Sequence, residues 1–309
     1  MRLAEIWPTL KETAVDWNDD NAAHLAAALA YYTLLSVAPI VVLAIAIAGL
    51  VFGQEAARGQ ISSEIGTVVG AQAGEAIQAI AKSARSPTTG ILSSIIGVVV
   101  LLFGASGVFG ELQAALNTIW KVAPKPGRGV LGVVKDRFFS FTMVVGVGFL
   151  LLVSLLLSAA LAAAGKFFGS ALPGGESLWF VINFAVSFGV VTALFALIFK
   201  IVPDAEIRWH DVWIGATATA LLFTLGKMLL GFYLGRPGVT SSYGAAGSIV
   251  ALVVWVYYSS QILFLGAEFT QVYARRCGSK IRPSDNAVPK ESGPTAQKQT
   301  EPPTPAVTQ

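Results

Sequence analysis

Six long stretches of this sequence are almost free of charged residues. They cover residues 25–53, 90–110, 138–165, 177–199, 212–234 and 238–268, and hold one charge, Lys227, before the closing Glu268. Each is at least as long as the roughly 20 apolar residues that a helix needs to cross a hydrocarbon core about 30 Å thick. The sequence therefore predicts an all-α polytopic membrane protein, a six-helix transmembrane bundle with amphipathic interfacial helices.

The overall composition excludes a soluble enzyme. Charged residues make up 13% of the chain, whereas a soluble domain has about 25% because its surface faces water. The net charge of +3 gives no support to a nucleic-acid partner, so we expect none. The expected partners are membrane lipids.

The positive charges predict the orientation of the chain. Six spans divide the Lys and Arg residues outside them into two sets of alternate loops. One set holds fifteen and comprises the N-terminal segment, residues 111–137, residues 200–211 and the C-terminal tail; the other set holds five. Because loops rich in Lys and Arg stay in the cytoplasm, both termini are expected to be cytoplasmic, in a bacterial inner (plasma) membrane.

Three segments outside the spans have patterns of their own. Residues 1–24 place Leu3, Ile6, Trp7, Leu10 and Trp17 at helical spacing among charges, which predicts a helix lying flat at the cytoplasmic interface. Residues 54–84 are predicted to form an external amphipathic segment that docks on the bundle. In the alternatives, this segment joins copies of the chain in a homo-oligomer or covers a ligand. Residues 277–309 are rich in Pro, Ser, Thr and Gln and are expected to form a disordered cytoplasmic tail.

Residues for hydrolytic chemistry are scarce. The chain has two His, His24 and His210, and one Cys, Cys277, whereas a metal site needs several converging ligands. No HExxH, CxxC pair, Walker A or GxSxG motif is present. We expect no catalytic residues, no cofactor and no metal.

Polar residues inside the spans are the strongest indication of a site, because each costs free energy in hydrocarbon and usually faces the bundle interior. On the last span, Tyr257, Gln261 and Glu268 fall within about 40 degrees of one another on a helix. The topology brings them near Tyr31, Tyr32 and Glu111. A cavity open to the cytoplasm is predicted from these six residues. In the alternative, Glu268 and Glu111 merely end helices and pair with Arg137, Lys135 or Lys121.

Two further features are weaker. Lys227 lies about 10 Å below the outer face of its span, and Asn183 matches it in depth, so the two are a predicted polar pair on the outer side. The alternative is that the Lys227 side chain reaches the interface by itself. Pro39 interrupts the first span and predicts a helix kink.

Three motifs resemble those of the YihY/BrkB family. They are the run 27–39 (AALAYYTLLSVAP), the run 107–113 (GVFGELQ) with Asn117-Thr118-Ile119-Trp120, and the run 243–248 (YGAAGS) followed by 255–261 (WVYYSSQ) and 266–270 (GAEFT). The resemblance covers about residues 19–276 and implies a bacterial inner-membrane protein with six spans. It implies no settled activity, although members have been linked to serum resistance and envelope lipid export. An older ribonuclease BN label finds no support here, because two-metal hydrolysis needs a cluster of carboxylate or His ligands.

The sequence thus favours a transporter or export component for a lipid-like or amphiphilic envelope molecule. The alternative is a non-transporting membrane scaffold that maintains the envelope and recruits partners through residues 54–84 and the tail.

Overall fold

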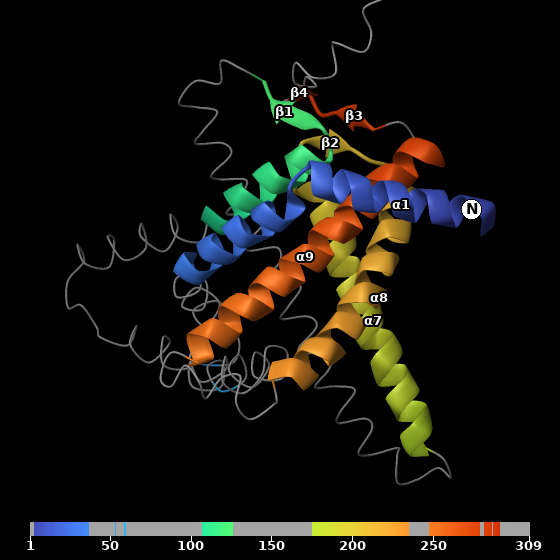
Figure 1. Cartoon of the computed structure of the whole chain (residues 1–309). Coiled ribbons are helices and arrows are strands. Elements are labelled where there is room, and N and C mark those ends of the chain that lie inside the picture. The colour runs from blue at the N-terminus through green and yellow to red at the C-terminus, as the bar shows by residue number, and fades with distance from the viewer. Residues whose placement is uncertain are drawn as a thin grey trace, which may run out of the picture.

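A computed structural model describes about half of the chain. The described residues are 3–36, 53, 59, 107–125, 175–234, 247–278, 281–285 and 287–290. Within them the chain is mostly helical, and long helices cross near one end of the molecule (Figure 1). The spans expected over 138–165 and most of 25–53 and 90–110 lie outside the described residues, as do Pro39 and all of segment 54–84 except Gly59.

Three helices of the described part are long and apolar enough to cross a membrane. Their apolar windows are Val181–Ile201, Trp209–Leu230 and Ile249–Arg276, within α7 (Gly175–Ile201), α8 (Trp209–Leu234) and α9 (Gly247–Arg276). A shorter apolar helix, Ala22–Ser36, begins the predicted first span. The described part is therefore mostly helical with three candidate membrane spans, which overlap the last three windows predicted from the sequence.

The end of the last span differs from the prediction. α9 continues past Glu268 to Arg276, and the helix that contains Glu111 runs over 107–119. Thr270, Val272 and Ala274 of the additional turns are fully buried, so packing extends α9 beyond the apolar window. The suggestion that Glu268 and Glu111 merely end their helices is therefore wrong, because both lie inside a helix.

α1 (Leu3–Asp19) lies across the end of the bundle and contacts α9 (Figure 1). Its buried positions are Thr9 and Thr13, whereas Ile6, Trp7 and Leu10 are exposed. Ile6, Trp7 and Leu10 of this amphipathic helix thus point away from the protein, whereas Trp17 packs against the core. This is the arrangement expected of a helix that lies flat on a membrane.

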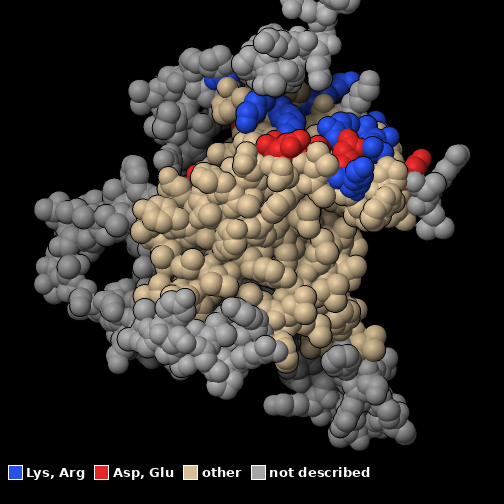
Figure 2. Space-filling model, in the orientation of Figure 1, with Lys and Arg blue, Asp and Glu red and all other residues tan. Residues whose placement is uncertain are grey.

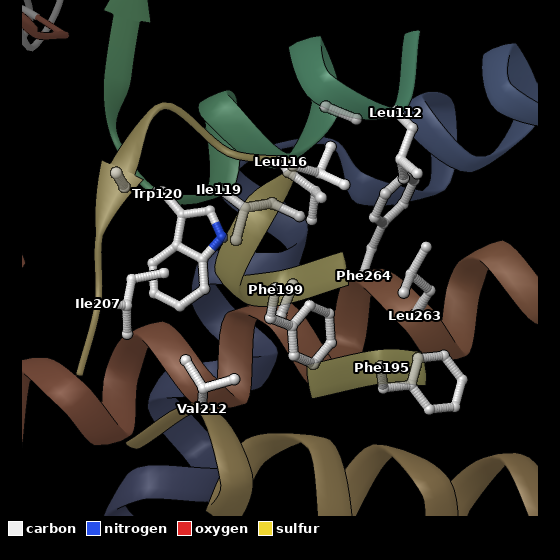
Figure 3. Close-up of a cluster of buried hydrophobic side chains, with 14 of the residues drawn as sticks. Leu112, Leu116, Ile119, Trp120, Phe195, Phe199, Ile207, Val212, Leu263 and Phe264 are labelled. Atoms are coloured by element: carbon white, nitrogen blue, oxygen red, sulfur yellow. The ribbon is translucent and has the colours of Figure 1, made fainter. Parts of the chain in front are cut away.

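Aromatic and aliphatic side chains hold the helices together. The Phe223 ring of α8 packs edge-on against Phe195 of α7 at 5.6 Å and against Trp255 of α9 at 6.3 Å. The helix over 107–119 adds Leu116, Ile119 and Trp120 to the core beside Phe199 (Figure 3). The core therefore joins elements far apart in sequence at the end of the bundle where α1 lies.

α8 and α9 approach closely through two Gly-xxx-Thr pairs. A Cβ placed on Gly215 would lie 2.6 Å from Thr270 Cβ, and one on Gly266 would lie 2.7 Å from Thr219 Cγ2. Each threonine hydroxyl donates to the glycine carbonyl of its own helix, from Thr219 to Gly215 at 2.7 Å and from Thr270 to Gly266 at 2.6 Å. Small residues of this kind let helix backbones approach each other closely in membranes. Here the missing side chain of each glycine leaves room for the threonine of the other helix.

Part of the segment expected to be disordered forms strands instead. β3 (Arg282–Pro283) pairs with β2 (Ala205–Glu206), and β4 (Ala287–Pro289) pairs with β1 (Val122–Pro124), both antiparallel. The prediction of disorder from residue 277 is therefore wrong for residues 281–285 and 287–290. Proline is tolerated here because it lies in short strands that have only one partner, and Ala287 is buried. Residues 291–309 lie outside the described part.

Candidate polar site at one end of the bundle

Charged side chains gather at the end of the bundle where α1 and the strands lie. Figure 2 shows Lys, Arg, Asp and Glu concentrated there, and uncharged residues over the rest of the described surface on this face. We call this region the polar end. The lower surface includes exposed apolar residues of α7 and α8, such as Val181, Phe184, Leu225 and Met228.

Glu268 is fully buried at the polar end. It lies between Gly266 and Thr270, the two α9 residues that contact α8, so the close packing of α8 and α9 fixes the rotation of α9 and with it the direction of Glu268. Neither of its carboxylate oxygens has a hydrogen-bond partner among the described residues. The charged groups that act on it are Asp20, Lys121 and Asp16.

Asp20 and Lys121 form an ion pair next to Glu268. The Lys121 ammonium donates to both carboxylate oxygens of Asp20 at 2.5 Å. Asp20 follows α1, and Lys121 follows the helix over 107–119. The backbone has positive φ at Asn21 (53°) and at Lys121 (55°), an uncommon conformation for residues other than glycine. Two left-handed residues thus end the two helices where the ion pair forms.

The buried polar atoms that lack a partner among the described residues belong to Glu268 and to residues close in sequence to Glu268, Asp20 or Lys121. In the described part of the chain, five buried side-chain atoms lack a hydrogen-bond partner: both Glu268 oxygens, Gln271 Oε1, and the indole nitrogens of Trp17 and Trp120. Gln271 lies one helical turn after Glu268, Trp17 one turn before Asp20, and Trp120 directly before Lys121. Buried polar groups are nearly always hydrogen-bonded in native proteins, so this grouping marks a site. We call Asp20, Lys121 and Glu268 the Glu268 site.

A polar network holds Lys121 in position. Asn117 Nδ2 donates to Asp204 Oδ2 at 3.0 Å, and the Asp204 amide donates to Asn117 Oδ1 at 2.8 Å. The Ser284 amide donates to the Asp204 carbonyl, and the Lys290 amide donates to the Lys121 carbonyl at 2.9 Å. The two strand pairs and this network therefore tie the residues around Lys121 to the α7–α8 connection.

Ion pairs join α1 to the end of α9. Arg275 pairs with Glu12 and with Asp16, and Arg276 pairs with Glu12. Both arginines are about two-fifths exposed, and exposed pairs contribute at most about 1 kcal/mol each. Their main effect is to orient α1 so that Asp20 stays near Glu268.

No hydrogen bond or ion pair of the described part of the chain links Glu268 to the other five residues of the predicted cavity, which stays a prediction. Tyr31 and Tyr32 are exposed, and their rings contact each other edge-on at 5.7 Å. Tyr257 is 36% exposed, and Gln261 and Glu111 are half-buried. Of the three cations considered as partners of Glu268, Lys121 acts on it, whereas Lys135 and Arg137 lie outside the described residues.

The predicted outer pair also stays a prediction. Asn183 and Lys227 are both exposed, and the described part of the structure has no hydrogen bond between them. Lys227 lies beside Met228 and Leu229, two of the most exposed apolar residues of α8. This placement fits the alternative, in which the Lys227 side chain reaches the interface by itself.

Metal-binding residues do not converge in the part of the chain that the structure describes. No group of three or more His, Cys, Asp and Glu that could hold a metal ion is found there. His24 and His210 are exposed, as is Cys277.

Sequence reasoning identified Glu268 but missed most of its surroundings. The sequence predicts no role in a site for Asp20, and it places Trp17 only on the apolar face of the interfacial helix. Trp120 has no predicted role beyond its motif, and Gln271 follows the last motif without a predicted role. The available signal was that Trp17 with Asp20 and Trp120 with Lys121 each combine an indole and a charge at a helix end, but nothing in the sequence shows that the two ends meet.

The chain matches known proteins over most of its length. The family model described as "Virulence factor BrkB" matches residues 13–291. A "UPF0761 membrane protein" of Pseudomonas aeruginosa is 30% identical over 251 residues, which cover 80% of this chain and 58% of that protein. Proteins of the same description from Verminephrobacter eiseniae and Rhodospirillum centenum are 29% and 27% identical, covering 85% and 86% of this chain and 62% and 57% of the relative. The chain thus spans about three-fifths of the length of these relatives. No solved structure matches it.

Proposed function

The chain belongs to the BrkB family of virulence factors, and on this premise we propose that it is a transporter or export component for a lipid-like or amphiphilic envelope molecule. The proposed location is the bacterial inner membrane, with both termini and the polar end in the cytoplasm. The proposed partners are membrane lipids and an amphiphilic substrate. Neither a cofactor nor a nucleic acid takes part, and the protein is not an enzyme.

One observation carries this proposal: Glu268, in a helix long and apolar enough to span a membrane, has a fully buried carboxyl group without a hydrogen-bond partner among the described residues. Such residues are costly in a membrane and generally mark substrate or ion pathways. The site lies at the junction of a charged end and a band of exposed apolar residues. An amphiphilic molecule has the same two parts, a polar group and an apolar chain.

Glu268→Gln tests this function. The variant keeps the size of the side chain and removes its charge, so we expect normal amounts of protein in the membrane and loss of activity. The measurement is mass spectrometry of lipids and small molecules that co-purify with wild-type protein and with the variant from matched membranes. A species enriched on wild type and absent from Glu268→Gln would identify the ligand class.

Glu206→Gln is the matched control, because Glu206 is exposed on β2 and outside the Glu268 site. It should retain the co-purifying species. The transport proposal fails if the two glutamine variants and wild type carry the same bulk lipids and support the same envelope phenotype.

A scaffold remains the second candidate because residues 281–290 reach across the polar end, from which residues 291–309 continue. Removing residues 291–309 distinguishes a transporter from a scaffold, because this truncation leaves β3 and β4 in place. A transporter should keep its activity after this truncation, whereas a scaffold that recruits partners through the tail should lose it. Co-purification of partner proteins with the full-length and truncated chains, together with the envelope phenotype, provides the measurement.

The orientation is testable through the single cysteine. Cys277 is exposed at the polar end, directly after α9. If this end is cytoplasmic, a membrane-impermeant maleimide should label Cys277 in inverted inner-membrane vesicles and leave it unlabelled in intact spheroplasts. Labelling only in spheroplasts would reverse the proposed orientation.

A further inference from the structure

The charges around Glu268 do not balance. Three carboxyl groups act at this point: Glu268, Asp20 and Asp16. Lys121 gives both of its described hydrogen bonds to Asp20, and Asp16 is paired with Arg275. Glu268 has no cation of its own and no hydrogen-bond donor among the described residues. An ionised carboxyl group buried in this way lacks the compensation that buried charges need.

The neighbouring elements that the structure describes supply no further positive charge to Glu268. α1 and the turn after it contribute Asp16 and Asp20, and the helix over 107–119 leads to Lys121. On α8, which also packs against α9, the acidic group Asp211 acts on Tyr273. Among the described residues, the Glu268 site is therefore one positive charge short.

We propose that the Glu268 site binds one proton, which Glu268 holds and donates as a hydrogen bond to Asp20. The proton comes from a hydronium ion in the water at the polar end: its O–H bond in that ion breaks as an O–H bond forms to one carboxylate oxygen of Glu268, and a water molecule is left. Release of the proton reverses this exchange. Two carboxyl groups facing each other share a proton readily because it turns their repulsion into a hydrogen bond.

The three side chains of the Glu268 site differ in their exposure to solvent. The side chain of Lys121 is 42% exposed and that of Asp20 is 12% exposed, whereas Glu268 is 0% exposed. Asp20 thus connects the surface to the buried carboxyl group. A proton can pass from water to Asp20 and then to Glu268 without opening the core.

The group at this site is a proton rather than a metal ion for two reasons. The described residues contain no cluster of three metal ligands, and the Lys121 ammonium occupies both oxygens of Asp20. A role of this proton in driving transport rests on the proposed transport function. Proton binding by Glu268 does not depend on that function, so the experiment measures proton binding directly.

Infrared difference spectroscopy tests the inference. The full chain is placed in nanodiscs of phosphatidylethanolamine and phosphatidylglycerol, and spectra are compared between wild type, Glu268→Gln and the exposed control Glu206→Gln. At neutral pH we expect the carbonyl band of a protonated carboxyl group in wild type and Glu206→Gln, and its loss in Glu268→Gln. Asp20→Asn should shift this band because the hydrogen-bond acceptor changes.

Two results would overturn the inference. Identical spectra of wild type and Glu268→Gln in the carbonyl region would show that Glu268 is ionised. A change of the carboxylate band when choline replaces Na⁺, seen in wild type but not in Glu268→Gln, would show that the site holds a metal cation. If the band is present but no ligand co-purifies, the proton site stands and the proposed transport function fails.

The thermal stability of Glu268→Gln gives an independent measurement. Glutamine has the shape and hydrogen-bonding capacity of a protonated glutamate, so its unfolding temperature should equal that of wild type. A clear fall, or failure of the variant to accumulate, would mean that the ionised form of Glu268 is required and would contradict the inference.

Discussion

Gly266→Ala is expected to destabilise the helix bundle, and Gly215→Ala/Gly266→Ala should abolish accumulation of folded protein. A methyl group on Gly266 would lie 2.7 Å from Thr219 Cγ2, and one on Gly215 would lie 2.6 Å from Thr270 Cβ. Both threonines are β-branched, are buried, and are fixed by hydrogen bonds to their own helices, so they cannot rotate away easily. The helices must therefore separate.

The expected cost exceeds any gain in helix propensity. Overpacking of a core costs about 1–3 kcal/mol per site, whereas replacing glycine with alanine in a helix gains at most about 1 kcal/mol. Two such sites remove a large part of the roughly 5–15 kcal/mol that stabilises a native protein. The measurements are the amount of protein in membranes and the unfolding temperature in nanodiscs.

Gly189→Ala is the control, because a Cβ on this α7 glycine has nothing within 4 Å. It should leave the unfolding temperature unchanged or raise it slightly. Adding Thr219→Ala to Gly266→Ala should recover part of the lost stability by removing the colliding atoms. Equal stability of Gly266→Ala and Gly189→Ala would show that α8 and α9 do not pack this closely.

The class of fold and the polar end were predictable because they depend on composition. Long uncharged windows specify helices that cross a membrane, and the helical spacing of Ile6, Trp7 and Leu10 specifies an amphipathic helix. The structure bears out the helical class, α1 and the three long spans that it describes. Each of these features is encoded within one segment of the chain.

The extent of α9 and the pairing of the tail were not predictable in the same way. Apolar windows end at the first charge, whereas α9 continues to Arg276 because its last turns pack against the rest of the bundle. The tail has the composition of a disordered segment, yet residues 281–290 find backbone partners on β1 and β2. Packing and strand pairing depend on distant residues, which local patterns do not record.

The candidate site was also predictable only where its signal lies within one segment of the chain. Glu268 was found because a carboxyl group at the end of an uncharged window is conspicuous. Its neighbours were not, because Asp20 and Lys121 are 101 residues apart in sequence and meet only when α1 lies across the bundle. The tyrosines at 31 and 32 shared the expected membrane depth with Glu268, but depth alone does not determine which face of a helix a residue occupies.

Trp120→Ala is expected to cost about 3–5 kcal/mol of the free energy of unfolding, the usual range for a buried tryptophan or phenylalanine. Trp120 is 2% exposed and lies in the core beside Ile119 and Ile207 (Figure 3). It directly precedes Lys121, whose left-handed backbone ends the helix. Loss of the indole should therefore also release Lys121 from Asp20. The measurements are the unfolding temperature and the infrared band of Glu268.

Trp213→Ala and Trp120→Phe separate the two effects of this substitution. Trp213 is 46% exposed on α8, so its removal leaves no internal cavity and should change the unfolding temperature little. Trp120→Phe keeps most of the buried ring while removing the unpartnered indole nitrogen, so it should cost less than Trp120→Ala and preserve the Asp20–Lys121 ion pair. If Trp120→Ala is no more destabilising than Trp213→Ala, the helix over 107–119 does not pack into the core as described, and Lys121 would not be held beside Glu268.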